Sequence, residues 1–555
     1  MMKIYINILA ACLVFCATLS CEKWQDRQVF EGSGLGAVTK YYELPETASE
    51  AHVDVIATMQ YDIRCDAEWL SVPASSQGRD GFNFTCQPNT GLTRQATILL
   101  AIDKTNHYDT LTVFQNGTTA IKTVSGVADG VGSIALNSQV ESVGLSAEYH
   151  NGAADWITDT QIVGNDLTFA YLKNETAFPR FASIVITYKD AAGVSLKHRF
   201  DVLQSNSADS LQPSKDAFSD LTKDGKWANC YVLPDGQAAA YAVEVKHVSG
   251  EMISDKIRTA EILWETTLGT VNNLVYVQSD NKLYFAKPAG VRGNAVVALK
   301  DYNGNILWSY HVWASGEAVN DIKLGEYFFM DRNLGALANA VPVETENGTV
   351  GMFYQWGRKD PFPPAKHLKD NNGLISAVYP ENAVVFTVAQ NGVPVETTVA
   401  NPNVYYWGNA NKGEQDWSSI PDQVYWSTSA KTDYDPCPHG YVVPDVDQLT
   451  ELTKDAAKGT KCSIITDDNG VKSYLVWGGW VRRKLADTHF AHVGQYPHLW
   501  STTIEDATET GSDPKTDAEK IYNGAYATNT PTSTLVYPRR WGGNVRCVKV
   551  QSQNN

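Results

Sequence analysis

Cysteine is scarce in this chain, with nine cysteines among 555 residues. Cys12 and Cys16 fall in an apolar N-terminal segment, and Cys21 directly follows it. Small domains that depend on disulfides carry cysteine at several times this density. The six remaining cysteines can therefore form local bridges, but they do not build the fold.

The sequence also lacks long hydrophobic runs and clusters of positive charge. After residue 20 no stretch reaches 18 uninterrupted apolar residues, so no transmembrane helix is predicted there. The formal net charge is −17, and no stripe of lysine or arginine reverses it locally. This charge excludes nucleic acid as a partner, because phosphate backbones are themselves negative.

Motifs of catalysis and metal binding are absent as well. The chain contains no Gly-x-Ser-x-Gly elbow, Walker loop, His-Glu-x-x-His, Cys-x-x-Cys or calcium-binding loop. Loop or core positions are expected for the histidine cluster of His489, His492 and His498. Turn and helix-cap positions, rather than a glycosidase acid and base, are expected for Asp433, Asp435, Asp445 and Asp447. The sequence predicts a protein that is not an enzyme and that uses no metal and no cofactor.

Apolar and aromatic residues are plentiful. Hydrophobic residues make up 43% of the chain, which includes 27 tyrosines and 15 tryptophans. This content supports folded cores and excludes wholesale disorder. A chain of 555 residues exceeds a single core and implies about three to five domains.

The N-terminus has the features of an export signal. Lys3 precedes the mostly apolar segment 4–19, and Leu19-Ser20-Cys21 follows. This ending resembles the lipobox of bacterial lipoprotein precursors, in which the cysteine is acylated and becomes the new N-terminus. The resemblance implies a signal peptide over 1–20, lipid such as palmitate on Cys21, and a polar tether over 21–40. It places the protein on the outer membrane, at the cell surface or on the periplasmic face.

The next part of the chain repeats itself. Residues 67–70 (Ala-Glu-Trp-Leu) recur 87 positions later as 154–157 (Ala-Asp-Trp-Ile). Further matches keep similar offsets: Arg94 with Arg180, and Gln115 with Gln204. Both copies contain alternating or β-branched runs broken by Asn, Gly and Pro, which is typical of an antiparallel sandwich. Two β-sandwich modules are predicted, at 41–118 and 119–206.

Four segments of the first copy carry a family resemblance. They are Trp-Leu-Ser-Val-Pro at 69–73, Asn-Thr-Gly at 89–91, Arg-x-Ala-Thr-Ile at 94–98 and Val-Phe-Gln-Asn at 113–116. These segments resemble the BACON domain, an Ig-like module of Bacteroidetes surface proteins, and 121–205 resembles a divergent second copy. The family's name implies carbohydrate binding, whereas some members act as spacers. Trp69 and Trp156 stand beside apolar residues at strand-like positions, so core packing is predicted for both rings.

Residues 213–318 keep the β pattern. Segment 294–300 is predicted to pair with 306–313, because Asn303-Gly304 between them supplies the positive φ of a tight turn. Ala-Asn-Cys-Tyr at 228–231, with the Ile-Leu-Trp steps that follow, resembles a module of Bacteroidetes fimbrillin-like surface lipoproteins. A third β module is expected, with Cys230 as a buried thiol rather than a nucleophile.

Residues 320–550 change character, with long polar loops and eight of the 15 tryptophans. Their landmarks are Phe-Met-Asp-Arg-Asn-Leu-Gly at 329–335, and the segments 351–362, 434–444, 499–503 and 544–549. In this order they resemble the Fibrobacter succinogenes major-paralogue domain, which is related to C-type-lectin-like folds. The segment Pro-His-Gly-Tyr-Val-Val-Pro at 438–444 lacks the arginine that this family has at the corresponding position. The expected fold class is mainly β and multidomain: three Ig-like sandwiches followed by an irregular α+β C-type-lectin-like domain.

Two cysteine pairs are candidates for bridges. Cys437 and Cys547 fall on the C-terminal landmarks, and closing that loop would stabilise the fold by roughly 4–5 kcal/mol. Two separate buried thiols are the alternative. Cys65 and Cys86 lie on neighbouring strand-like segments, where a bridge and free thiols are equally open.

The sequence favours a non-catalytic protein that binds glycan or acts as an adhesin, with the β modules as a stalk. Long loops on a rigid scaffold commonly carry binding residues, so the C-terminal domain is the expected ligand surface. Its candidate contacts are Trp356, Trp407, Trp417, Trp426, Trp477 and Trp480. The alternative is a structural subunit with fimbrial or envelope protein partners. Ser210 and Thr110 follow aspartate in triplets that resemble the Bacteroidetes O-glycosylation motif.

Overall fold

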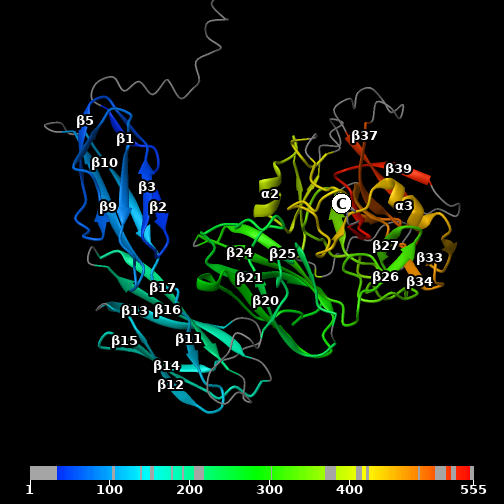
Figure 1. Cartoon of the computed structure of the whole chain (residues 1–555), viewed down its shortest axis with the longest axis horizontal. Helices are drawn as coiled ribbons and strands as arrows, with labels where there is room; N and C mark the ends of the chain where they lie inside the picture. Colours follow the sequence, from blue (N-terminus) through cyan, green and yellow to red (C-terminus); the bar gives the residue numbers. More distant parts are fainter. Residues whose placement is uncertain are drawn as a thin grey trace, which may run out of the picture. The chain divides into compact units, whose positions relative to one another are not determined.

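The protein is mainly β and multidomain, as the sequence predicts (Figure 1). The computed structural model describes residues 34–102, 107–137, 140–149, 155–176, 179–190, 193–205, 218–234, 236–301, 303–368, 380, 383–389, 391–407, 416–420, 424–484, 488–506, 520–526 and 533–550. Among these residues no helix combines the length and apolarity that a membrane crossing requires.

The chain forms two compact units. Unit 1 comprises Met1–Thr118 with two later segments, Ala135–Val143 and Thr187–His198. Unit 2 comprises Thr119–Ile134, Gly144–Ile186 and Arg199–Asn555.

The first module is a sandwich of short strands. Its sheets have the strand orders β2-β10-β9-β5-β7, β3-β8-β6 and β1-β4. The strands are β1 (Leu35–Ala37), β2 (Tyr41–Leu44), β3 (Ser49–Val53), β4 (Val55–Ala57), β5 (Gln60–Arg64), β6 (Leu70–Ser71), β7 (Ser75–Gln77), β8 (Phe82–Cys86), β9 (Arg94–Ala101) and β10 (Tyr108–Gln115). In β8, Phe82 and Phe84 are buried while Asn83 is exposed, which is the alternation of a strand with one face on a core.

The second strand of this module, β2, lies at the edge of the large sheet beside the last strand. Strand β2 runs parallel to the last strand, β10, with Tyr41 opposite Thr112 and Leu44 opposite Gln115. Strand β10 pairs with β9 in the antiparallel direction. The core between the sheets includes Tyr61, Phe84 and Val113.

The second module repeats this plan. Its sheets have the orders β11-β17-β16-β13 and β12-β15-β14, and β11 again runs parallel to the last strand, β17. The strands are β11 (Lys122–Val124), β12 (Gly130–Ala135), β13 (Glu141–Tyr149), β14 (Ile157–Val163), β15 (Asp166–Tyr171), β16 (Arg180–Lys189) and β17 (Ser195–Gln204). The shared topology explains why the two sequences align.

The third module, green in Figure 1, pairs two four-stranded sheets, β18-β20-β23-β22 and β19-β25-β24-β21. Its elements are β18 (Ser219–Asp220), β19 (Cys230–Val232), β20 (Ala239–Glu244), β21 (Thr259–Glu265), β22 (Asn272–Val277), η3 (Gln278–Asp280), β23 (Lys282–Lys287), β24 (Gly293–Lys300) and β25 (Ile306–Ala314). The predicted hairpin is confirmed, since β24 pairs with β25 and Gly304 has a φ of 84°.

The C-terminal part is less regular. Its strand orders are β26-β27-β41-β31, β36-β35-β40-β37-β38-β39 with β28 on β40, β29-β30 and β32-β33-β34. The elements are β26 (Asp321–Leu324), β27 (Tyr327–Met330), β28 (Phe353–Gln355), β29 (Val385–Val388), α2 (Val395–Ala400), β30 (Val404–Trp407), β31 (Tyr441–Val442), α3 (Val446–Thr453), β32 (Ala457–Lys458), β33 (Cys462–Thr466), β34 (Lys472–Val476), β35 (Trp480–Lys484), β36 (Thr488–Ala491), β37 (Leu499–Asp506), β38 (Lys520–Tyr526), β39 (Ser533–Pro538), β40 (Gly542–Asn544) and β41 (Val548–Lys549). Asp445 caps α3 in a capping box with Gln448, which confirms its predicted helix-cap position.

One hydrophobic cluster contains residues of both the third module and the C-terminal part. Cys230, Trp264 and Trp313 of the third module belong to the same buried cluster as Trp356 and Trp417. Burial raises the pKa of the Cys230 thiol, as expected for a structural cysteine. The boundary predicted between residues 318 and 320 therefore crosses one buried cluster, although each side also has clusters of its own.

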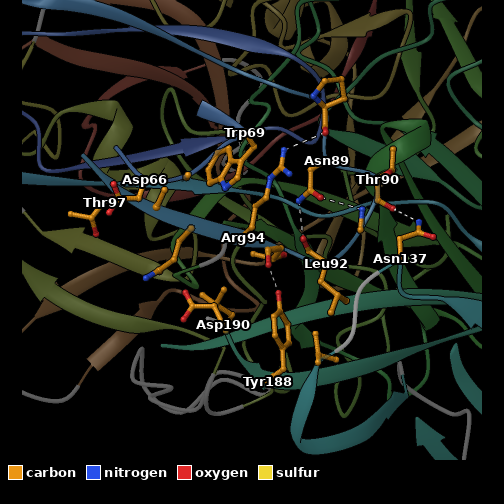
Figure 2. Close-up of a pocket in the computed structure, with 18 residues that line it drawn as sticks. Asp66, Trp69, Asn89, Thr90, Leu92, Arg94, Thr97, Asn137, Tyr188 and Asp190 are labelled. Carbon is orange, nitrogen blue, oxygen red and sulfur yellow. Dashed lines mark hydrogen bonds between the residues drawn. The ribbon is translucent and has the colours of Figure 1, made fainter. Parts of the chain in front are cut away.

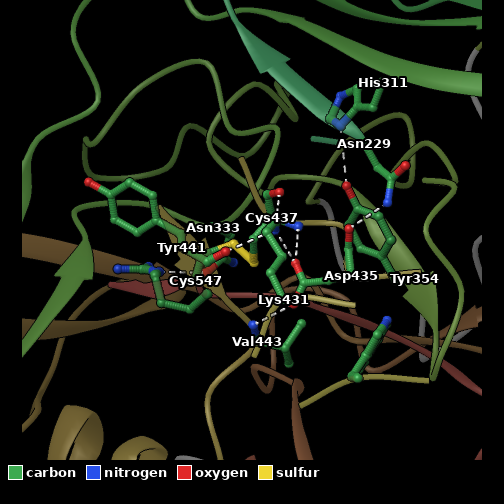
Figure 3. The surroundings of a disulfide bond; sticks show 12 residues. Asn229, His311, Asn333, Tyr354, Lys431, Asp435, Cys437, Tyr441, Val443 and Cys547 are labelled. Atoms are coloured by element: carbon green, nitrogen blue, oxygen red, sulfur yellow. Dashed lines mark hydrogen bonds and ion pairs between the residues drawn. A yellow bond between two sulfur atoms is a disulfide. The ribbon is translucent and has the colours of Figure 1, made fainter. Parts of the chain in front are cut away.

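A disulfide joins Cys437 to Cys547, with a Cα–Cα distance of 6.0 Å. Figure 3 shows Lys431 and Asp435 beside it. Asp435 accepts hydrogen bonds from the backbone N–H groups of Cys437, at 2.8 Å, and Val443, at 3.2 Å. The predicted bridge is thus confirmed. For Cys65 and Cys86, where the sequence leaves a bridge and free thiols equally open, the structure has two free thiols.

Candidate ligand-binding pocket

A pocket of about 680 Å³ lies in unit 1, within the range of about 300–1,000 Å³ that is usual for ligand sites. Its walls come from the first module and from the two later segments of unit 1. The lining residues are Asp66, Ala67, Trp69, Pro88, Asn89, Thr90, Gly91, Leu92, Thr93, Arg94, Gln95, Ala96, Thr97, Asn137, Val140, Tyr188, Asp190 and Leu196.

Trp69 and Arg94 form the centre of this pocket (Figure 2). Trp69 precedes β6 and is half-buried, and the Arg94 guanidinium carbon lies 4.5 Å from its ring centroid. Arg94 Nε donates to Gln115 Oε1 at 2.9 Å, and Nη2 donates to the carbonyl of Gln87 at 2.9 Å. Burial lowers the pKa of this guanidinium, although arginine stays charged at neutral pH. The cation is therefore held in a fixed place beside the indole ring.

The loop before β9 forms a rigid wall. Asn89 is buried, and its Nδ2 donates to the carbonyls of Leu92 and Asn116, each at 2.8 Å. Its Oδ1 accepts from the backbone N–H of Gly91 at 3.1 Å. Because this one amide fixes three backbone groups, the loop keeps its shape without a ligand.

Two later segments of unit 1 hold the same loop from the other side. Asn137 Nδ2 donates to the Thr90 carbonyl at 2.9 Å, and the Tyr188 hydroxyl donates to the Thr93 carbonyl. Asp190 adds a half-buried carboxylate whose Oδ1 accepts from the backbone N–H of Val194 at 2.8 Å. Sequence reasoning missed these residues, since only the packing of unit 1 brings them to a loop about fifty to one hundred residues earlier.

The second module repeats the central arrangement without the pocket. Arg180 lies 4.8 Å from the ring of Trp156, and its Nε donates to Gln204 at 2.7 Å. Trp156 is only 1% exposed, which confirms its predicted place in the core. Trp69 differs from that prediction, since it is half-buried and lines the pocket.

The six tryptophans predicted as ligand contacts do not form an exposed surface. Five of them are core residues with exposed fractions of 0–4%, so the prediction of an open sugar-stacking face is wrong for Trp356, Trp407, Trp417, Trp426 and Trp480. Their indole groups are also used internally: Trp356 Nε1 donates to the Ser501 carbonyl at 2.8 Å, and Trp417 Nε1 donates to the Trp356 carbonyl at 2.7 Å. Trp477 is half-buried, and its Nε1 donates to Ser463 Oγ at 3.0 Å.

The histidine cluster is distributed between core and loop positions. His498 is buried, and desolvation lowers its pKa to about 3. His492 stacks on Trp480 with ring centroids 4.5 Å apart, and the side chain of His489 lies outside the described residues. In the described part of the chain no three His, Cys, Asp or Glu side chains gather as metal ligands.

The remaining candidates concern modification and acidic residues. Thr110 is exposed on β10 and thus accessible, whereas Ser210 and Cys21 lie outside the described residues. Asp433 Oδ1 accepts from the backbone N–H of Ser249 at 3.0 Å, which is a loop contact, and Asp435 is fully buried. Asp445 is half-buried at the N-cap of α3, and Asp447 is exposed in the first turn of that helix.

Comparison with known proteins confirms the family resemblance of the first module. Residues 60–116 match the BACON family model, described as "Putative binding domain, N-terminal". The matched segment includes Trp69 and Arg94. No curated protein sequence matches the chain. The resemblances of the third module and of the C-terminal part to named families stay predictions.

Several solved structures are similar to parts of this chain. A Bacteroides ovatus GH5 xyloglucanase in complex with a XXXG heptasaccharide is 17% identical, over 15% of this chain and 19% of that chain, with a TM-score of 0.15. This chain therefore spans 19% of the length of that enzyme. A tandem of titin Ig domains is 9% identical, over 32% of this chain and 100% of that chain, with a TM-score of 0.15. The Bacteroides ovatus SGBP-B of a mixed-linkage glucan utilization locus, in complex with a mixed-linkage heptasaccharide, is 10% identical over 53% and 75% of the two chains, with a TM-score of 0.13. These scores are low, so the likenesses carry no conclusion about function.

Proposed function

We propose that this protein is a non-catalytic cell-envelope lipoprotein that binds glycan in the pocket of unit 1. One observation carries the proposal: a pre-formed pocket of about 680 Å³ lies on the segment that matches the BACON model. The N-terminal lipobox supports attachment to a membrane through Cys21. The C-terminal part then serves as a folded body rather than as the ligand surface.

The pocket has the chemistry that a sugar requires. The C–H face of a sugar ring packs on an aromatic ring, and its hydroxyls need both donors and acceptors. Trp69 offers an indole, Arg94 a fixed cation, and Asp66 and Asp190 two carboxylates. The rigid loop over residues 88–93 means that little conformational entropy is lost on binding.

The first test places a larger side chain in the pocket to block it. Thr97 is exposed and lines the pocket, so Thr97→Trp should block entry without disturbing the core. Glycan-array binding should disappear in this variant and persist in Tyr108→Trp, a control on an exposed residue of the same module outside the pocket. Unchanged binding by Thr97→Trp would place the ligand elsewhere and overturn the proposal.

Truncation of the indole gives a second test. Trp69→Ala should weaken glycan binding by about 1–3 kcal/mol, the usual cost of losing an aromatic anchor. Trp69 also packs on the core of its module, so the melting temperature is measured alongside. Trp477→Ala, in the C-terminal part, is the matched control and should leave affinity unchanged.

The anchor is tested separately from the pocket. Cys21→Ala should release the protein from the membrane fraction, because the acylated thiol is the proposed attachment. Equal membrane retention of the wild type and the variant after signal cleavage would refute the lipoprotein assignment and leave the pocket assignment untouched.

A further inference from the structure

We infer that the pocket of unit 1 selects neutral glycans and rejects acidic ones. This inference rests on the proposed function, since it names the ligand class of the same site. It follows from the balance of charged groups at the pocket and from the hydrogen bonds that already occupy its cation.

The pocket carries more negative than positive charge. Asp66 and Asp190 are its carboxylates, and Arg94 is the single cationic side chain among its lining residues. A uronic acid or sulfated sugar would bring a further negative charge into a space of about 680 Å³. In a pocket of this size the ligand's charge would lie close to the two carboxylates. Repulsion between like charges at short distances is appreciable even in a largely aqueous setting.

Arg94 is poorly placed to offset this repulsion. Its Nε donates to Gln115 and its Nη2 donates to the carbonyls of Gln87 and Pro88, so two of its three nitrogens already have acceptors. A planar bidentate contact with a carboxylate or sulfate needs two free donors on one edge of the guanidinium. The same hydrogen bonds recur at Arg180 in the second module, which indicates that they serve the fold.

The two carboxylates suit hydroxyl donors. Asp190 lines the pocket, and its Oδ1 accepts from the backbone N–H of Val194 at 2.8 Å, which holds the carboxylate in place. Asp66 is exposed at the rim and can accept from a ring hydroxyl. Neutral sugars present such hydroxyls at every ring, whereas the net charge of −17 also repels an acidic polysaccharide at long range.

The experiment compares two panels of polysaccharides on the full chain. The neutral panel contains β-glucan, xylan, mannan and galactan, and the acidic panel contains polygalacturonate, alginate and heparin. Retention in affinity gel electrophoresis should occur with at least one neutral polymer and be at least about tenfold weaker with every acidic one at low salt. Binding to the acidic panel that equals or exceeds binding to the neutral panel overturns this inference and leaves glycan binding intact. Binding to neither panel overturns the proposed function instead.

A charge-neutralising variant identifies the cause of the selectivity. In Asp66→Asn with Asp190→Asn, we expect the affinity for the neutral ligand to fall about threefold to tenfold, since charge-assisted hydrogen bonds are lost. The discrimination against acidic polymers should shrink at the same time. Asp80→Asn, an exposed carboxylate outside the pocket, is the control and should change neither value. Unaltered discrimination in the double variant would overturn the assignment to these carboxylates.

Discussion

Three side chains recur at the same places in both repeats: a tryptophan, an arginine over its ring and a glutamine that accepts from the arginine. In the first module they are Trp69, Arg94 and Gln115, and Arg94 also donates to loop carbonyls. The second module repeats every one of these contacts through Trp156, Arg180 and Gln204. An arginine that bonds two loop carbonyls replaces the ladder hydrogen bonds that the loop lacks.

We predict that removing this arginine costs stability rather than ligand affinity. Arg180 is 8% exposed, and Arg180→Met would remove the donor to the Lys173 carbonyl and to Gln204 Oε1, while the Leu172 carbonyl would keep only its hydrogen bond from Gln204 Nε2. Unfolding in urea should show a loss of about 2–4 kcal/mol. Lys189→Met, an exposed position at the end of the same strand, should change stability by less than about 0.5 kcal/mol. If Arg180→Met also lost less than about 0.5 kcal/mol, the structural role of Arg180 would be contradicted.

Another residue responds to pH. His311 is buried with Nε2 2.9 Å from Asn294 Oδ1, and desolvation lowers its pKa to about 3. In the unfolded chain its pKa returns to about 6.5. Between these values the unfolded state binds more protons than the folded state, so His311 favours folding above pH 6.5 and disfavours it progressively as the pH falls toward 3.

The slope of stability against pH measures this effect. From pH 6.5 downward, each such histidine should reduce the free energy of unfolding by about 1.4 kcal/mol per pH unit. In His311→Gln, the curve should be flatter by that amount, whatever the overall stability of the variant. Parallel curves for wild type and variant would show that His311 is protonated in the fold.

At the scale of elements, local sequence patterns predicted local pairing well. The turn at Asn303-Gly304 predicted the hairpin of β24 and β25, because a two-strand pairing depends on residues adjacent in the chain. The burial of Trp356 and Trp417 could not be predicted in this way. Their neighbours, such as Ser501, lie up to 145 residues away, and their segments have no periodicity that marks an inner face.

The sequence predicts only part of the candidate site, because the other part depends on contacts between residues far apart in the chain. The motif of the first module contains Trp69 and Arg94, which are 25 residues apart and belong to one family segment. Asn137 and Asp190 join them through the packing of unit 1 and have no motif of their own. The large number of tryptophans favoured the C-terminal part as the ligand surface. In the structure, this number instead reflects the size of the hydrophobic core there.

The disulfide stabilises the irregular C-terminal part by joining two of its segments. Cys547 immediately precedes β41, which pairs with both β27 and β31, and Cys437 precedes β31. Cys437→Ala with Cys547→Ala should lower stability by about 2–5 kcal/mol, because the bridge closes a sequence separation of 110 residues. Calorimetry under non-reducing conditions measures the loss. Cys65→Ala, which removes a half-buried free thiol, is the control and should shift the transition far less.

At the scale of the molecule, the third module and the C-terminal part behave as one body in the structure. Lys359 is buried, and its Nζ donates to the Ser309 carbonyl at 2.8 Å and to Asp360 Oδ1 at 2.7 Å. Asn229 Nδ2 donates to the carbonyls of Asp433 and Asp435. Separating the two parts would remove Ser309 from Lys359 and Asn229 from the carbonyls of Asp433 and Asp435, and would open the shared cluster.

A fragment of residues 320–555 should therefore fold poorly, although its sequence has the pattern of a complete domain. A fragment of residues 213–555 keeps Ser309, Asn229 and the tryptophans of the third module. We expect the longer fragment to be monodisperse with a cooperative thermal transition, and the shorter one to aggregate or melt at least about 10 °C lower. Equal melting temperatures would show that the cores are independent.

In each of the three β modules an early strand runs parallel to the last strand, and this direction has a mechanical consequence. Strands β2 and β10 point the same way, so the chain enters their ladder at Tyr41 and leaves it at Gln115, at the opposite end. A pull on the two ends slides one strand along the other and loads every hydrogen bond of the ladder together, whereas an antiparallel closure would open one bond at a time. The same geometry recurs where β11 lies beside β17 and where β19 lies beside β25. Each of these parallel closures therefore resists extension along the direction of its own strands.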